Sequence, residues 1–203
     1  MDSLIEGYRR FRAGGWQQHR AVFRTLAERG QSPRAMVITC ADSRLDPQLV
    51  FDAGPGEIFV VRNVAALVPP YERDAAYHGT SAALEFAVRT LKVEHIIVLG
   101  HAQCGGIGAL LRGAGELGAD FVEHWMQIAA PARERAMAVA GDAESAQTLC
   151  EHEAVKVSLD HLMTFPWVKE RVESDELHLH GWYFGIEKGD LLRLGKDGQF
   201  RPV

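Results

Sequence analysis

The amino-acid sequence predicts an α/β fold with a mostly parallel central β-sheet, flanked by helices and preceded by a helical N-terminal arm. We expect about four parallel strands plus a short antiparallel edge strand. Short runs that are apolar on both faces alternate with segments of helical periodicity, which is typical of a parallel sheet covered on both sides. No Ser/Gly/Pro linker and no repeat of fixed period divides the 203 residues. We therefore expect a single domain over residues 1–203, with residues 1–30 as the arm.

The arm is predicted to contain two helices. Residues 2–12 place apolar side chains on one helical face and arginines on the other, and residues 15–29 predict a second helix that Gly30 ends. Because the apolar stripe is short, we expect the first helix to pack on its own or a partner subunit rather than on a membrane.

The rest of the chain alternates between the two kinds of element. A strand over residues 35–39 precedes a short helix, because Asp46 suits an N-cap and Pro47 suits the first helical turn. The later elements are a strand at 58–61, a helix at 78–91, a strand at 94–100, a helix opened by Gly105-Gly106, helices at 117–139, 144–162 and 166–174, a strand at 177–186 and a short strand at 191–194.

Composition excludes several classes of function. The hydrophobic share of 47% is enough for a sizeable core, and the net charge of −5 argues against broad binding to nucleic acid or anionic membrane. No apolar run approaches the ~20 residues of a membrane-spanning helix, and the N-terminus has no signal-peptide pattern. We expect a cytoplasmic protein without nucleic-acid or membrane partners. Three cysteines in such a chain suggest metal binding or chemistry rather than disulfides.

Two short segments follow the first and third predicted strands. One runs from Cys40 to Arg44 and includes Asp42; the other runs from His101 through Cys104. If these strands are neighbours, both segments reach one crevice at the carboxyl ends of the sheet. Two thiols and one imidazole suit Zn²⁺ and leave its fourth position open, as in catalytic sites. An arginine two residues after the aspartate would keep that carboxylate ionised.

These segments resemble the signature loops of the β-class carbonic anhydrases, in the plant-type branch that bacteria also carry. The likeness extends to Gln31-Ser32-Pro33, Pro55-Gly56-Glu57, Val61-Arg62-Asn63 and Glu151-His152-Glu153-Ala154-Val155. The resemblance implies reversible hydration of CO₂ to bicarbonate and a proton by a zinc-bound hydroxide. It implies one Zn²⁺ per chain and self-association as a homodimer or a multiple of dimers.

The resemblance also assigns the site residues. Its metal ligands are Cys40, His101 and Cys104. Its catalytic dyad is Asp42 and Arg44. Its substrate-binding residues are Gln31, Phe59, Val64, Phe86 and Gly105. Phe86 stands where plant relatives carry tyrosine, which leaves the proton-transfer route open.

Other functions fit the same residues. Carbonyl sulfide or carbon disulfide hydrolysis occurs on related proteins, and a non-catalytic zinc- or bicarbonate-binding protein is a further alternative. A cysteine-dependent phosphatase would need arginine six positions after its cysteine, and Arg44 follows Cys40 by four. In one branch of the family the aspartate ligates zinc at low pH, beside a tryptophan three residues before the first zinc cysteine. Val37 occupies that position here, so we expect Asp42 to pair with Arg44 and to leave the zinc open.

Overall fold

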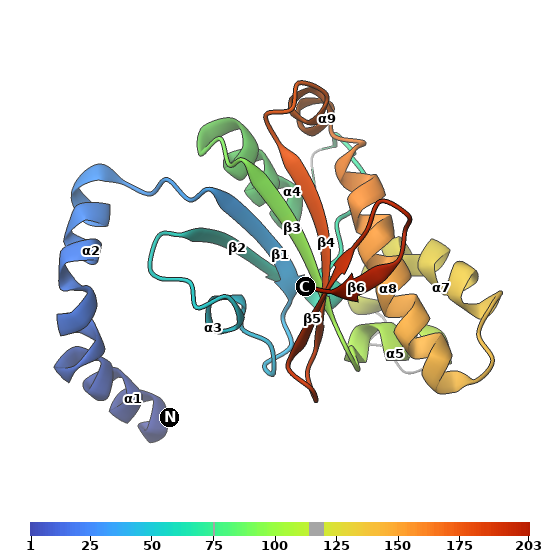
Figure 1. Cartoon of the computed structure of the whole chain (residues 1–203), viewed down its shortest axis with the longest axis horizontal. Coiled ribbons are helices and arrows are strands. Elements are labelled where there is room, and N and C mark those ends of the chain that lie inside the picture. The colour runs from blue at the N-terminus through green and yellow to red at the C-terminus, as the bar shows by residue number, and fades with distance from the viewer. Residues whose placement is uncertain (75, 114–119) are drawn as a thin grey trace.

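The computed structural model describes residues 1–74, 76–113 and 120–203, and these form a six-stranded sheet in the order β2-β1-β3-β4-β5-β6 (Figure 1). Strands β2, β1, β3 and β4 are parallel, and β5 and β6 are antiparallel. The strands are β1 (Ala35–Cys40), β2 (Ile58–Asn63), β3 (His95–His101), β4 (His178–Gly185), β5 (Asp190–Leu194) and β6 (Phe200–Pro202). The predicted mostly parallel sheet is confirmed. Strand β6 was not predicted, because three residues are too few to show a periodic pattern.

Most predicted helices are present with small changes at their ends. The helices are α1 (Asp2–Ala13), α2 (Gly15–Arg29), α3 (Pro47–Val50), α4 (Gly79–Glu85), α5 (Gly105–Arg112), α6 (Val122–Met126), α7 (Ala130–Met137), α8 (Ala143–Leu162) and α9 (Pro166–Glu173). Asp46 caps α3 as predicted, accepting hydrogen bonds from two backbone N–H groups. The helix predicted at 78–91 is α4 followed by a π-helical turn over Phe86–Thr90. None of the described helices is long and apolar enough to cross a membrane.

The predicted continuous helix at 117–139 is wrong. Its first residues, 117–119, lie outside the described residues, and the remainder is α6, a 3₁₀ turn over Gln127–Ala129 and α7. The physical reason is Pro131, which lacks the backbone N–H that a continuous helix would need and lies instead in the first turn of α7.

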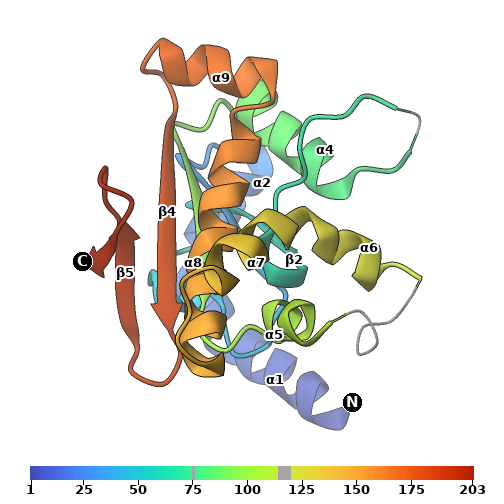
Figure 2. The same cartoon turned by 90° about the vertical axis from the view of Figure 1, so that its right-hand side faces the viewer.

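The two faces of the sheet are covered unequally. One face packs against α4, α8 and α9, and Figure 2 shows α8 running along β4 with α7 beside it. The other face, which includes Val37 and Ile97, packs against Val50 and Phe51 in and just after α3. On β4 this second face leaves Trp182 only half-buried. The expected cover on both faces is therefore thin on one side of the single chain.

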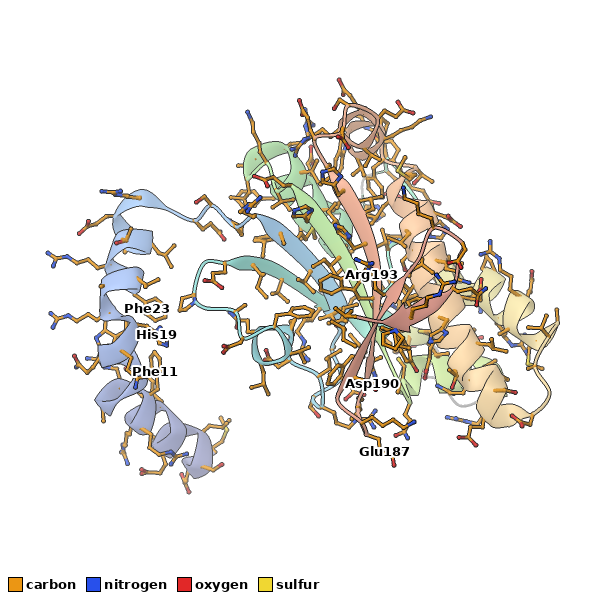
Figure 3. All side chains as sticks on the ribbon, in the orientation of Figure 1. Phe11, His19, Phe23, Glu187, Asp190 and Arg193 are labelled. Carbon is orange, nitrogen blue, oxygen red and sulfur yellow. The ribbon has the colours of Figure 1, made fainter. Side chains whose placement is uncertain are left out.

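The arm stands away from the sheet (Figure 1). Every residue of α1 and α2, all of which are described, is exposed or half-buried. The rings of Phe11, Trp16 and Phe23 contact one another and tie α1 to α2. Figure 3 shows Phe11, His19 and Phe23 on the side of the arm that faces the rest of the chain. The arm thus presents apolar surface that its own chain does not bury.

Candidate metal centre

The structure brings together the ligating atoms of Cys40, His101 and Cys104, which all lie within 4.8 Å of one another. Cys40 ends β1, His101 ends β3, and Cys104 is the N-cap of α5. Because β1 and β3 are parallel neighbours, their carboxyl ends meet at the same edge of the sheet, as expected. All three side chains are buried, with exposed fractions of 6%, 2% and 4%.

The imidazole of His101 is held in the state that a metal ligand needs. Its Nδ1 lies 2.8 Å from the carbonyl oxygen of Ala102, so Nδ1–H donates and Nε2 keeps its lone pair. Nε2 is buried and makes no hydrogen bond within the described part of the chain. A buried acceptor without a partner, directed at two thiols, fits a metal ion.

The two cysteines are also suited to a cation. Cys40 Sγ accepts a hydrogen bond from the backbone N–H of Ala65 at 3.4 Å. Hydrogen bonding from Cys104 lowers the pKa of Cys40 to about 4, and the same interaction raises the pKa of Cys104. One thiolate is therefore favoured even without a metal, and a divalent cation between the sulfurs would stabilise both. A Cys/His/Cys donor set of this kind fits Zn²⁺.

Asp42 is paired with Arg44 through both carboxylate oxygens. The Arg44 side chain donates to Oδ1 at 3.0 Å and to Oδ2 at 2.7 Å, and its backbone N–H donates to Oδ1 at 2.9 Å. The same guanidinium donates to the carbonyl oxygen of Gln103 at 3.0 Å. The hydrogen bonds from Arg44 hold the pKa of Asp42 well below its usual range. Asp42 Oδ2 lies 3.9 Å from His101 Nε2, so an ionised carboxylate stands beside the ligand set.

A second arginine holds the loop that carries these groups. Arg62, near the end of β2, donates to the carbonyl oxygen of Cys40 at 3.1 Å and to that of Asp42 at 2.7 Å. It also donates to the carbonyl oxygen of Leu45. Sequence reasoning missed this role. The available signal was a charged residue directly after the apolar run of the strand predicted at 58–61.

A buried carboxylate supports the centre from behind. Glu151 of α8 is 3% exposed, and its Oε1 accepts a hydrogen bond from the backbone N–H of Cys104 at 2.8 Å. Gln147 donates to the same oxygen, and the Tyr183 hydroxyl donates to Oε2 at 2.6 Å. Burial raises the pKa of Glu151, although these hydrogen bonds oppose the shift. The sequence analysis did not predict this role. The available signal was an acidic residue, Glu151, on the same helical face as Cys150 and Ala154.

The five expected substrate residues fall into two groups. Val64 follows Asn63, the register partner of Cys40, and Gly105 follows Cys104, so these two lie beside the candidate metal ligands. Phe59 is instead the partner of Met36, about 13 Å back along the strands from the metal end.

Phe86 lies beside Phe59, since their rings are 6.0 Å apart. Gln31 precedes the first residue of β1, whereas Cys40 is the last residue of that strand. Within one chain, the structure therefore does not bring Gln31, Phe59 and Phe86 to the candidate metal ligands.

Comparisons with known proteins agree with this arrangement. Residues 35–191 match the sequence model of the carbonic anhydrase family. Beta carbonic anhydrase 3 of Arabidopsis thaliana is 36% identical over 201 residues, which cover 96% of this chain and 77% of that protein.

Solved structures show the same likeness. The β-carbonic anhydrase CcaA superposes with a TM-score of 0.91 at 33% identity, covering 100% of this chain and 99% of that one. One of two β-carbonic anhydrases described as tetrameric, from the filamentous ascomycete Sordaria macrospora, superposes with a TM-score of 0.83 at 29% identity, covering 96% of each chain.

Proposed function

Since the chain belongs to the β-class carbonic anhydrases, enzymes of the carbonate dehydratase class, we propose that it hydrates CO₂ reversibly at a zinc ion held by Cys40, His101 and Cys104. One observation carries this proposal: a buried Cys/His/Cys set stands beside an ionised aspartate that is not part of it. A bound zinc would supply the oxygen nucleophile by lowering the pKa of water toward ~7. The thiolates of Cys40 and Cys104 offset the charge of that ion, so we expect activity to favour alkaline pH.

Asp42 has the properties needed to orient the nucleophile. A carboxylate that accepts a hydrogen bond from the attacking oxygen fixes the direction of its lone pair toward CO₂. Asp42 acts purely as an acceptor only while it is ionised, and the hydrogen bonds from Arg44 keep it ionised. Because both carboxylate oxygens are engaged by Arg44, we expect Asp42 to leave the fourth zinc position to water or substrate.

The substrate pocket is completed, in our proposal, by a second copy of the chain. Gln31, Phe59 and Phe86 lie at the end of the sheet away from the metal ligands of their own chain. Phe86 is 44% exposed, which is unusual for a large apolar ring and fits a contact with another protomer. In a two-fold dimer the same surface serves both copies, so each protomer would lend this group to its partner's metal centre. The tetrameric relative supports self-association.

The decisive experiment is stopped-flow CO₂ hydration on protein of measured zinc content. Turnover that scales with zinc supports the proposal. Zinc-loaded protein without CO₂ turnover would favour the non-catalytic alternative. Hydrolysis of carbonyl sulfide or carbon disulfide in place of CO₂ hydration would favour the sulfur-substrate alternative.

A further inference from the structure

Three histidines gather at the end of the sheet opposite the metal centre. His95 begins β3, and His178 and His180 lie at the start of β4. His95 is the register partner of His178, and His180 lies two residues further along on the same face of the sheet. The starts of parallel strands lie at the opposite edge from their carboxyl ends, so this cluster is separate from Cys40 and its partners.

Two of the imidazoles already stand at the spacing of metal ligands. His180 Nε2 lies 3.3 Å from His95 Nδ1. Two nitrogens bound to one tetrahedral zinc at ~2.0–2.1 Å are themselves separated by about 3.3 Å. Without a metal, one of these nitrogens donates a hydrogen bond to the other. A metal ion can replace that proton, because the ring that holds it can carry its proton on the outer nitrogen instead.

The third imidazole lies next to this pair. The ring of His178 is centred 5.4 Å from that of His95, and its Nδ1 is 3.7 Å from an Asp175 carboxylate oxygen. The Asp175 side chain is almost fully exposed, so this interaction restrains the ring only weakly. Rotation of the half-exposed His178 side chain would add a third nitrogen donor, and water would complete the coordination.

The surroundings of His180 favour its neutral imidazole, the form that binds metal. Burial lowers the pKa of His180, and nearby positive charge on the other two histidines and Arg193 lowers it further. The carboxylate of Glu94 is paired with Arg34. It lies close enough to His95 and His178 to interact with both. The cluster therefore offers nitrogen lone pairs beside negative charge, a combination suited to a divalent cation.

We propose that His95 and His180, with His178 as a third ligand, form a second site for a first-row divalent ion such as Zn²⁺. Neutral imidazole nitrogens suit zinc, copper and nickel rather than magnesium or calcium. In the single chain the site is partly open to solvent and it lacks thiolates, so it binds more weakly than the Cys/His/Cys centre. Its occupation would link β3 to β4 at their first residues. The inference is independent of the proposed catalytic function, because it uses none of the catalytic groups.

The test is a calorimetric titration of Zn²⁺ into protein that already holds one equivalent of zinc. We expect the wild-type chain to take up one further ion. His180→Gln should lower the affinity for this ion at least about tenfold, since even outer-shell changes alter metal affinity by about 10–100-fold. His95→Gln should do the same, and His178→Gln should have a smaller effect. His124→Gln, which removes an exposed histidine of α6, is the matched control and should bind like wild type.

A second readout separates binding from misfolding. Added Zn²⁺ should raise the melting temperature of the wild type and of His124→Gln but not of His180→Gln, because an ion that binds only the folded state stabilises it. Far-UV circular dichroism and CO₂ hydration at one equivalent of zinc should be the same in all these variants. The proposal is overturned if the wild type binds no second ion up to about 1 mM free Zn²⁺. Equal uptake by His180→Gln and the wild type would overturn it as well.

Discussion

Asp42 shows how a single residue's partners decide its role. A carboxylate beside two thiolates would be repelled by their charge, yet three hydrogen bonds from Arg44 keep its pKa low. We predict that Asp42→Asn retains its zinc but loses CO₂ hydration by about a hundredfold or more, because the amide is a poor acceptor for the nucleophile. Stopped-flow rates normalised to zinc content measure this effect. Wild-type turnover in the variant would show that the assigned role is wrong.

The three cysteines differ in the same way. Burial raises the pKa of Cys150 to about 12, so its thiol stays protonated and is unsuited to a metal ion. We predict that Cys104→Ala purifies with little or no zinc, while Cys150→Ala, the matched control at another buried thiol, retains one equivalent. Elemental analysis after dialysis measures both. Full zinc content in Cys104→Ala would refute the ligand assignment.

His152 makes stability depend on pH. Burial lowers its pKa to about 4, and its Nε2 makes no hydrogen bond within the described residues. Between about pH 6.5 and 4 the unfolded chain binds a proton there that the folded chain does not, so this residue lowers stability as pH falls through that window. This shift corresponds to roughly 3 kcal/mol, and because the side chain is partly exposed, solvent screening reduces the expected contribution to about 2 kcal/mol.

The variant His152→Phe isolates this effect. The new ring can keep the stacking on Phe200, whose ring is centred 4.3 Å away, and cannot titrate. Urea unfolding from pH 7 to pH 4 should show a shallower loss of stability in the variant than in the wild type. Because acid should release any bound zinc from both proteins alike, the difference between them is the relevant quantity. Identical pH profiles would contradict the prediction.

At the scale of elements, α8 connects the core to the candidate metal centre. Glu151 on this helix accepts a hydrogen bond from the Cys104 N–H, at the point where α5 begins. We predict that Glu151→Gln keeps that acceptor but adds an amide group, so it retains zinc while changing the ligand environment. A shifted visible spectrum of the cobalt-substituted protein would show this. Tyr183→Phe, which removes one donor to the same carboxylate, should shift the spectrum less. An unchanged spectrum in Glu151→Gln would contradict the prediction.

Elements with local signals were predictable from the sequence, and those that depend on distant contacts were not. The strand ending at Cys40 and the helix capped by Asp46 carry apolar runs and capping residues within a few positions. Their structure agrees with the prediction. The support from Arg62 and Glu151 depends on contacts with Cys40 and Cys104, between residues far apart in the sequence. Such contacts produce no periodic pattern in the amino-acid sequence.

At the scale of the whole molecule, the arm and the sheet each leave apolar surface uncovered. Leu4 is 71% exposed and Tyr8 is 61% exposed on α1, and Trp182 is only half-buried on the thinly covered face of the sheet. Burial of such surface is favourable at roughly 25 cal/mol per Å², which gives a second copy reason to bind. We therefore predict a dimer or larger assembly by light scattering at micromolar concentration. A monomeric mass would refute it.

Mixing two inactive variants tests whether the copies share active sites. Gln31→Ala damages the group that we assign to the partner's pocket, and Asp42→Asn removes the carboxylate that orients the nucleophile in its own chain. If the pocket is shared, a mixed dimer has one site with both defects and one with neither. Dimers re-formed from an equal mixture should then recover about a quarter of wild-type activity, because half of the dimers are mixed and one of the two sites in each mixed dimer is intact.

If Gln31 acted within its own chain, every site would carry one defect, and the mixture would be no more active than the average of the two variants. That result, with light scattering showing that the chains had exchanged, would refute the shared pocket and leave the metal-centre assignment standing.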